Sequence, residues 1–310
     1  MSSRTLAYFR GVGWIAAAVA TTFVWARSVE KTTEPPLPEG VTVVRDVTYR
    51  VIDGRRLALD LYLPAESGPE LRPTIVAVHG GSWVGGSKRD YGPQFARFAK
   101  HGFVVAVVDY RLARPGAPSW DKAFEDVAAA VDWLGDHAES YAIDAGRLAA
   151  IGTSAGGMLA AHLGLGTPVI GDKRPRHHVR ASVCLSTPTS LAKLITRRSL
   201  QHDPVLDLIG HAPGVLETRG WDASPIDHVS AGSRPILLIH GTDDSWVLID
   251  QAREMRDKLE RMGIPNRLIE IVGARHGFEL RVEAPSPRDL LPDVLDFLNE
   301  VWRERASDAA

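Results

Sequence analysis

Short apolar runs alternate with helix-like stretches along most of the chain. Mainly apolar runs of this length are typical of strands that are buried on both faces of a sheet. They occupy residues 74–78, 103–108, 148–151, 179–185, 235–239 and 267–272. The stretches between them have helical spacing or composition, at residues 91–101, 123–137, 158–165, 248–262 and 290–305. This alternation predicts an α/β fold with a mainly parallel, twisted sheet and helices on both of its faces.

Two segments depart from this alternation. Residues 41–51 and 57–63 alternate apolar and polar positions around Asp53 and Gly54, which predicts an antiparallel hairpin at the edge of the sheet. Residues 188–233 mix short helical pieces with prolines, and the segment is longer than a connection between two strands needs. We therefore expect residues 188–233 to form a small helical insertion that covers the site like a cap.

The start of the chain is typical of a targeting segment. Residues 11–26 are uncharged and mainly apolar, with Arg10 before them and Arg27 after them. This pattern resembles a secretory signal, and a spanning helix usually needs about 20 apolar residues. We predict a signal peptide or N-terminal membrane anchor at residues 1–27, and hence an exported or membrane-tethered protein. A proline-rich linker and one folded domain follow, at residues 28–40 and 41–306.

Composition narrows the class of protein. The 310 residues are 45% hydrophobic and 24% charged, with a formal net charge of −2, as is ordinary for soluble domains. This balance gives no reason to expect nucleic acid as a partner. Cys184 is the only cysteine, so the sequence excludes an internal disulfide and a cysteine metal cluster. Because Cys184 stands in an apolar run, we expect it to be a buried core thiol.

One turn carries candidate chemistry. The sequence G-T-S-A-G runs from Gly152 to Gly156, between an apolar run and an expected helix, with Ser154 at its centre. A strand, the turn G-x-S-x-G and a helix form the context in which a serine is held on a strained corner. Small residues are needed there, because a β-carbon at Gly152 or Gly156 would collide with neighbouring backbone. Taken alone, the motif fits a nucleophilic serine or a tight glycine turn.

Polar residues that follow two other apolar runs extend this picture. In an open α/β sheet, ligands bind beyond the carboxyl ends of the strands. Asp243 and Asp244 follow the run at 235–239, and His276 follows the run at 267–272. A serine, a carboxylate and a histidine therefore come to one edge of the sheet in the chain order of the α/β-hydrolases.

Several motifs, taken in order, resemble the carboxylesterase and lipase branch of the α/β-hydrolases, and the resemblance extends from Val41 to Arg305. Within this branch the chain is most similar to esterases of the hormone-sensitive-lipase type and of the acetyl- and feruloyl-xylan-esterase type. The motifs, in one-letter code, are HGGSW at 79–83, DYR at 109–111, GTSAGG at 152–157, A-S-P (alanine, serine, proline) at 223–225, HGTDD at 240–244 and HG at 276–277. The resemblance implies an α/β-hydrolase fold, serine ester hydrolysis, and no metal or organic cofactor.

The resemblance also implies a role for each candidate catalytic residue. Ser154 would attack the substrate, and His276 would take its proton and later pass it to the leaving alcohol. A carboxylate would hold the imidazole in the correct tautomer. The family pattern favours Asp244 for this role and leaves Asp243 as a loop or capping residue.

The glycine-rich loop after the first buried run is the candidate oxyanion hole. Backbone N–H groups stabilise the charge of a tetrahedral intermediate, and glycines allow them to approach it closely. We expect the donors to be Gly81, Ser82 and Ala155, with Ser82 where many relatives have a third glycine. A phosphate-binding loop is the rival interpretation, but no Gly-Lys-Ser/Thr follows.

Other polar and aromatic residues have plainer interpretations. We expect His79 and His240 to make local hydrogen bonds in their glycine turns. Asp109 and Arg111 are expected to form a charge pair or to brace a loop. Pocket lining and core packing are equally good interpretations of three tryptophans near the motifs, Trp83, Trp221 and Trp246.

Two alternatives to ester hydrolysis stay open. Amide hydrolysis by the same residues is the nearer one, because HGGSW also resembles the motif of kynurenine formamidases and the wider fold includes peptidases. A binding protein on an inactive hydrolase scaffold is the other. The expected partner is a small-molecule ester; the sequence leaves its acyl group, its alcohol and the oligomeric state open.

Overall fold

The computed structural model describes residues 36–66, 68, 70–167, 175–195 and 203–308. The predicted signal or anchor at 1–27, its possible tether at 11–26 and the linker as far as residue 35 lie outside the described residues and stay predictions. Leu37 precedes the first strand and packs against the core. Within the described ranges, no helix combines the length and the apolar character that crossing a membrane would require.

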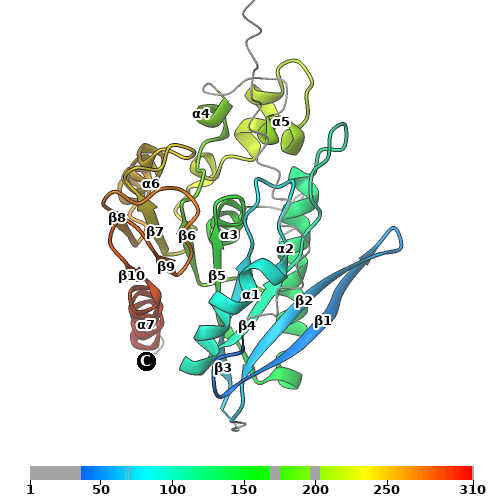
Figure 1. Ribbon diagram of the computed structural model, residues 1–310, viewed down its shortest axis with the longest axis vertical. Helices are drawn as coiled ribbons and strands as arrows, with labels where there is room; N and C mark the ends of the chain where they lie inside the picture. Colours follow the sequence, from blue (N-terminus) through cyan, green and yellow to red (C-terminus); the bar gives the residue numbers. More distant parts are fainter. Residues whose placement is uncertain (1–35, 67, 69, 168–174, 196–202, 309–310) are drawn as a thin grey trace, which may run out of the picture. The chain divides into compact units, whose positions relative to one another are not determined.

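Eight strands form the main sheet of the described chain (Figure 1). They are β1 (Val41–Ile52), β2 (Arg55–Pro64), β3 (Arg72–Val78), β4 (Val104–Val108), β5 (Ile143–Thr153), β6 (Ala181–Leu185), β7 (Ile236–Gly241) and β8 (Asn266–Ile271). Their order across the sheet is β1-β2-β4-β3-β5-β6-β7-β8. β2 pairs antiparallel with β1 and with β4, and every later neighbour is parallel. The predicted edge hairpin and the mainly parallel sheet are both confirmed.

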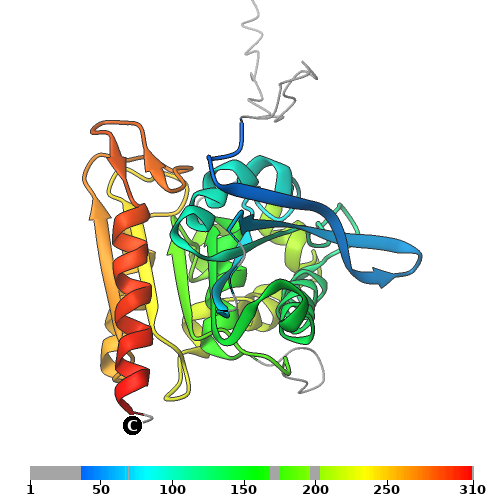
Figure 2. The ribbon, with the colours of Figure 1, turned by 90° about the horizontal axis from the view of Figure 1, so that it is seen from below.

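Helices cover both faces of this sheet, as the sequence predicts. The larger helices are α1 (Lys88–Phe95), α2 (Trp120–Asp136), α3 (Ala155–Leu165), α6 (Ile249–Arg261) and α7 (Leu291–Asp308). Along β3, Val76 and Val78 join the core that α2 and α3 cover, whereas Ile75 and Ala77 join the core that α1 and α7 cover. The strand is buried on both faces because it is apolar at every one of these positions. Figure 2 shows α7 packed along the part of the sheet that holds β7 and β8.

A few local details differ from the sequence prediction. The helix expected at 91–101 is α1 followed by a 3-10 segment, Ala96–His101. β5 begins at Ile143, before the apolar run at 148–151, because its first residues pair with β3 at Arg72. A small two-stranded ladder, β9 (Arg281–Val282) with β10 (Arg288–Asp289), was not expected. Such short ladders have too few residues to show a periodic pattern.

The segment at 188–233 contains several short helices, and its residues 196–202 lie outside the described part. The short helices are α4 (Leu191–Ile195), α5 (Pro204–Ile209), η4 (Leu216–Gly220) and η5 (Pro225–His228). The segment leaves the sheet after β6, and α4 and α5 lie together at the top of Figure 1. Leu208 is buried in the core that α2 and α3 share, and its carbonyl accepts the N–H of Ser119 at 3.0 Å. The role of the segment 188–233 as a cap over the site stays a prediction.

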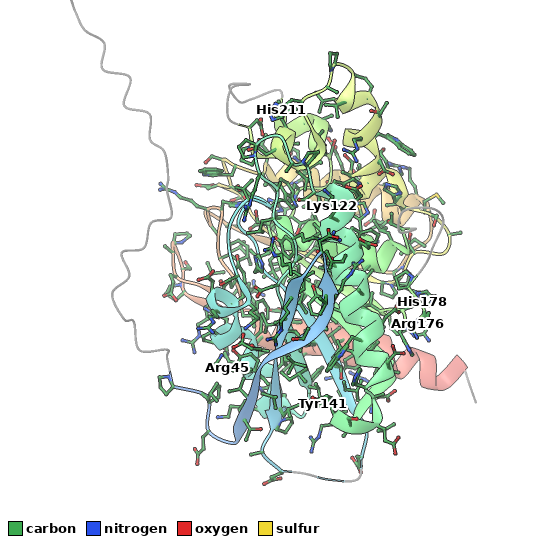
Figure 3. The ribbon with its side chains drawn as sticks, turned by 90° about the vertical axis from the view of Figure 1, so that its right-hand side faces the viewer. Arg45, Lys122, Tyr141, Arg176, His178 and His211 are labelled. Carbon is green, nitrogen blue, oxygen red and sulfur yellow. The ribbon has the colours of Figure 1, made fainter. Side chains whose placement is uncertain are left out.

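Residues 176–178 pack beside α2. Figure 3 shows Lys122 near the start of this helix, and Arg176 and His178 beside its later turns. Both terminal nitrogens of the Arg176 guanidinium donate to the carboxylate of Asp136 on α2, at 2.9 and 2.6 Å. The N–H of His177 donates to Asp132 at 2.9 Å. These contacts attach residues 176 and 177 to the last turns of α2.

Candidate active site

Ser154 stands at the corner where β5 ends and α3 begins. Its backbone has φ 54° and ψ −118°, a sparsely populated conformation that costs roughly 1–3 kcal/mol. The surrounding backbone imposes this conformation. A Cβ at Gly152 would overlap the Gly156 backbone, and a Cβ at Gly156 would overlap the carbonyl oxygens of Val78 and His79. The predicted need for glycine on both sides of the serine is confirmed.

The structure brings three predicted residues into one hydrogen-bonded chain. The Oγ of Ser154 lies 3.0 Å from Nε2 of His276. The Nδ1 of His276 lies 2.7 Å from Oδ2 of Asp244. Because the carboxylate accepts a proton from Nδ1–H, Nε2 carries the lone pair that accepts the Ser154 hydroxyl proton. His276 is half-buried and Asp244 is buried.

Asp244, not Asp243, is the carboxylate that contacts the imidazole. Its Oδ1 accepts the N–H groups of Trp246 at 2.9 Å and Val247 at 2.8 Å. Burial by itself would raise the pKa of this carboxyl, but hydrogen bonds from His240 and His276 outweigh burial and hold the pKa well below its usual range. Asp244 is therefore ionised at neutral pH. Asp243 is exposed and accepts the hydroxyl of Thr242 at 3.2 Å, as expected of a loop residue.

His240 supports Asp244 more directly than the sequence predicted. Its Nε2 lies 2.8 Å from the carbonyl of Val247 and 3.3 Å from Oδ2 of Asp244. Both neighbours are acceptors, so Nε2 carries the proton and donates toward both. The expected local bond is confirmed, and the second contact was missed. A signal was present, because His240 and Asp244 open and close the same short turn.

The loop with Gly81 and Ser82 lies beside Ser154. A Cβ at the preceding Gly80 would lie 3.5 Å from Cβ of Ser154. The loop turns back on itself, because the carbonyl of Gly81 accepts the N–H groups of Val84 and Gly85. Ser82 has φ 53°, so a serine occupies the left-handed conformation that glycine adopts more easily.

Three predicted donors have no protein acceptor in the described ranges. No hydrogen bond between described residues uses the backbone N–H groups of Gly81, Ser82 or Ala155. Ala155 is the first residue of α3, where N–H groups have no acceptor within the helix. The positive end of the helix dipole also lies at this position. These N–H groups can therefore donate hydrogen bonds to an oxygen atom of a ligand.

Side chains from the end of β4 hold this loop in place. The Tyr110 hydroxyl donates to the carbonyl of His79 at 3.0 Å, and the two rings stack with centroids 4.3 Å apart. Oδ1 of Asp109 accepts the N–H of Lys88 at 2.8 Å. Lys88 is buried, and its Nζ donates to Asp60 at 2.6 Å. Asp109 therefore braces the loop, which was one of the two roles that the sequence predicted for it.

The other expectation, a charge pair between Asp109 and Arg111, is wrong. The guanidinium of Arg111 donates from Nε to Oδ2 of the buried Asp126 at 2.7 Å, and also contacts Glu125. Both carboxylates lie on α2. The segment after β4 is irregular, and Asp109 contacts α1 whereas Arg111 contacts α2. Adjacency in the sequence did not reveal this separation.

The three tryptophans near the motifs have three different environments. Trp83 is buried in the core. Trp221 is half-exposed on the insertion and packs against His228, with ring centroids 5.6 Å apart. Trp246 is half-exposed and stacks on His276, with ring centroids 6.3 Å apart and an interplanar angle of 22°. The contact between Trp246 and His276 joins residues that are thirty positions apart, and no sequence signal could have shown it.

This fold and this edge of the sheet define the class of the protein as an α/β-hydrolase. The mainly parallel eight-stranded sheet carries a serine on a strand-to-helix corner, with a histidine and a carboxylate arriving from later strands. Within the class, a family model named BD-FAE matches residues 59–259. The chain belongs to this family, within the carboxylesterase branch.

Named relatives and solved structures agree with this placement. Esterase LipC of Mycobacterium tuberculosis is 30% identical over 81% of this chain and 64% of its own length. A thermophilic esterase of the planctomycete Thermogutta terrifontis, Est2, is 27% identical at a TM-score of 0.67, with 87% of this chain and 94% of Est2 covered. Est2 is also known phosphoramylated by tabun. A truncated carbohydrate esterase from gut microbiota shares the fold, with 24% identity, a TM-score of 0.69 and coverage of 84% and 96%.

The chain spans between half and two thirds of the curated relatives that it matches first.

Proposed function

We propose that this protein is a serine carboxylic-ester hydrolase in which Ser154, His276 and Asp244 form the catalytic triad. The observation that carries the proposal is the hydrogen-bonded chain from Ser154 through His276 to Asp244, at 3.0 and 2.7 Å. The names of LipC and Est2 support the reaction class. A strained serine beside unpaired backbone N–H groups is also what acyl transfer requires.

The proposed reaction has two halves. Oγ of Ser154 attacks the ester carbonyl while Nε2 of His276 takes the hydroxyl proton. The carbonyl oxygen becomes negative and accepts the N–H groups of Gly81, Ser82 and Ala155, each worth roughly 3 kcal/mol of barrier. The C–O bond to the alcohol then breaks, and the alcohol leaves with the proton from His276. Water loses a proton to the same imidazole, attacks the acyl-enzyme and releases the acid and the Ser154 hydroxyl.

Asp244 acts through the imidazole. Because its pKa is held below the usual range, the carboxylate remains charged when His276 becomes an imidazolium, and it stabilises that cation at short range. It also fixes the tautomer that leaves Nε2 facing Ser154. The N–H groups of Trp246 and Val247 and the ring of His240 hold the carboxylate in this position.

A panel of p-nitrophenyl esters of increasing acyl length, with N-formylkynurenine alongside, tests this proposal. We expect hydrolysis of the short esters with a kcat of at least about 1 per second. We also expect a fluorophosphonate to label Ser154, as the tabun adduct of Est2 suggests. Ser154→Ala should lower kcat by about 10⁴-fold or more, because the nucleophile is lost, and should leave the thermal unfolding temperature unchanged. Turnover of N-formylkynurenine in preference to every ester would favour the amide-hydrolase alternative, and no labelling of Ser154 would favour the inactive scaffold.

A further inference from the structure

Trp246 lies beside the imidazole of His276, and half of its surface faces solvent. The exposed fraction is 50%, and the indole is nearly parallel to the imidazole, at 22°. Tryptophan is a large apolar residue that folded proteins bury to a high degree on average. Core packing therefore does not account for the exposed half of this indole.

The hydrogen bond between this residue and Asp244 does not involve the indole. The backbone N–H of Trp246 donates to Oδ1 of Asp244 at 2.9 Å, and any residue except proline would supply this donor. A change of the side chain thus preserves the bond that holds Asp244. The indole itself can be tested separately from the triad.

The geometry of ester cleavage shows which part of the substrate Trp246 would meet. This step rests on the proposed function. The carbonyl oxygen is directed to the N–H groups of Gly81, Ser82 and Ala155. The oxygen of the leaving alcohol must reach Nε2 of His276 to take its proton. The alcohol therefore passes alongside the imidazole, and the residue stacked on that imidazole lies next to it.

We infer that Trp246 forms a wall of the leaving-group side of the site and selects esters whose alcohol carries a flat aromatic ring. The exposed part of the indole offers an aromatic ring an offset or edge contact, worth about 0.5–1.5 kcal/mol beyond area burial. This corresponds to a preference of about two- to tenfold. A saturated ring of the same size gains the area burial but not the aromatic contact.

Trp221 is the matched control. It is exposed to a similar degree, 56%, and it also packs beside a histidine, His228. It lies on the 188–233 insertion, and no ring contact within the described part of the chain joins it to the triad. Loss of this indole removes a comparable apolar surface from another place.

The experiment compares kcat/KM for two pairs of esters. Benzyl acetate and cyclohexylmethyl acetate differ only in the ring of the alcohol. Ethyl phenylacetate and ethyl cyclohexylacetate differ only in the ring of the acyl group. The proteins are the wild type, Trp246→Ala, Trp246→Phe and Trp221→Ala. Thermal unfolding and fluorophosphonate labelling of Ser154 establish that each variant is folded with its triad intact.

We expect the wild type to prefer benzyl acetate over its saturated partner by about two- to tenfold. Trp246→Ala should bring this ratio close to one, whereas Trp246→Phe and Trp221→Ala should keep most of it. An unchanged benzyl ratio in Trp246→Ala would overturn the inference, and so would a change confined to the acyl pair. If the wild type hydrolyses the p-nitrophenyl esters but none of these four, the inference falls alone. If it hydrolyses neither set and Ser154 is not labelled, the proposed function falls, and this inference falls with it.

Discussion

The turn that holds Ser154 and the loop that holds Gly81 and Ser82 lie side by side, but they are held in different ways. The turn is wedged into the core by backbone contacts, with Gly156 against the carbonyls at the end of β3. The loop packs on itself and is tied to the rest of the molecule by side chains, notably Tyr110 and Asp109. Substitutions in the turn should therefore lower the free energy of unfolding. Substitutions that remove the side-chain contacts of the loop should lower kcat.

The largest expected effect is that of Gly156→Ala. Its Cβ would overlap two backbone carbonyl oxygens, and neither can move without shifting β3. We expect the free energy of unfolding to fall by about 4 kcal/mol or more. Urea denaturation of the soluble fraction would measure it. Gly232→Ala is the matched control, because its Cβ would meet little besides the Ser230 hydroxyl at 3.9 Å. Equal stability of the two variants would show that close backbone contacts at Gly156 do not hold the turn in place.

The next effect is a dependence of the free energy of unfolding on pH. It arises from His162 in the last turn of α3, the helix that follows Ser154. His162 is fully buried, with Nδ1 2.9 Å from the Thr167 hydroxyl and Nε2 3.1 Å from the Ala223 carbonyl. One nitrogen accepts and the other donates, as in a neutral imidazole. Burial, and then the charge of His228, lowers the pKa of His162 to about 3.

The sign of this dependence follows from the lowered pKa. Below the ordinary value of 6.5 the unfolded chain binds a proton that the folded chain does not. The free energy of unfolding then falls by about 1.4 kcal/mol per pH unit, roughly 2 kcal/mol between pH 6.5 and 5. Above pH 6.5 the contribution of His162 to the free energy of unfolding is nearly constant. Urea unfolding of the wild type and His162→Asn at pH 7.5, 6 and 5 measures it, and parallel curves for the two proteins would contradict a role of His162.

The smallest expected effect separates the loop from the turn most sharply. Tyr110→Phe removes the hydroxyl that donates to His79 in the loop, and Ser182→Ala removes one that donates to Ala160 on α3 at 2.7 Å. Both donors are buried, so each variant should lose about 1 kcal/mol of stability. Only Tyr110→Phe should lower kcat, by about fivefold, with KM little changed. An equal loss of kcat in both variants would mean that the hydrogen bond from Tyr110 to His79 has no specific role in positioning the loop.

Much of the fold was predictable because its causes are local. Residues 75–78 and 236–239 are apolar at every position, and a strand of that kind needs cover on both faces wherever it lies. The hairpin around Asp53 and Gly54 followed from alternation and turn chemistry. Chain order then brought Ser154 and His276 to one edge, because parallel strands all end on the same side.

Contacts between distant side chains were not predictable in this way. Arg111 pairs with Asp126 on α2 instead of Asp109, because the irregular segment after β4 directs the two side chains to different elements. The stacking of Trp246 on His276 depends on how the loops after β7 and β8 lie beside each other.

The sequence by itself determined the kind of fold and the residue types that could act, because periodicity and glycine spacing are properties of short segments. The tertiary structure decided which atoms meet: Asp244 at Nδ1 of His276, His240 behind that carboxylate, and Trp246 on the imidazole. Such contacts operate over a few ångströms, and only packing of the whole domain brings residues from separate loops within that range.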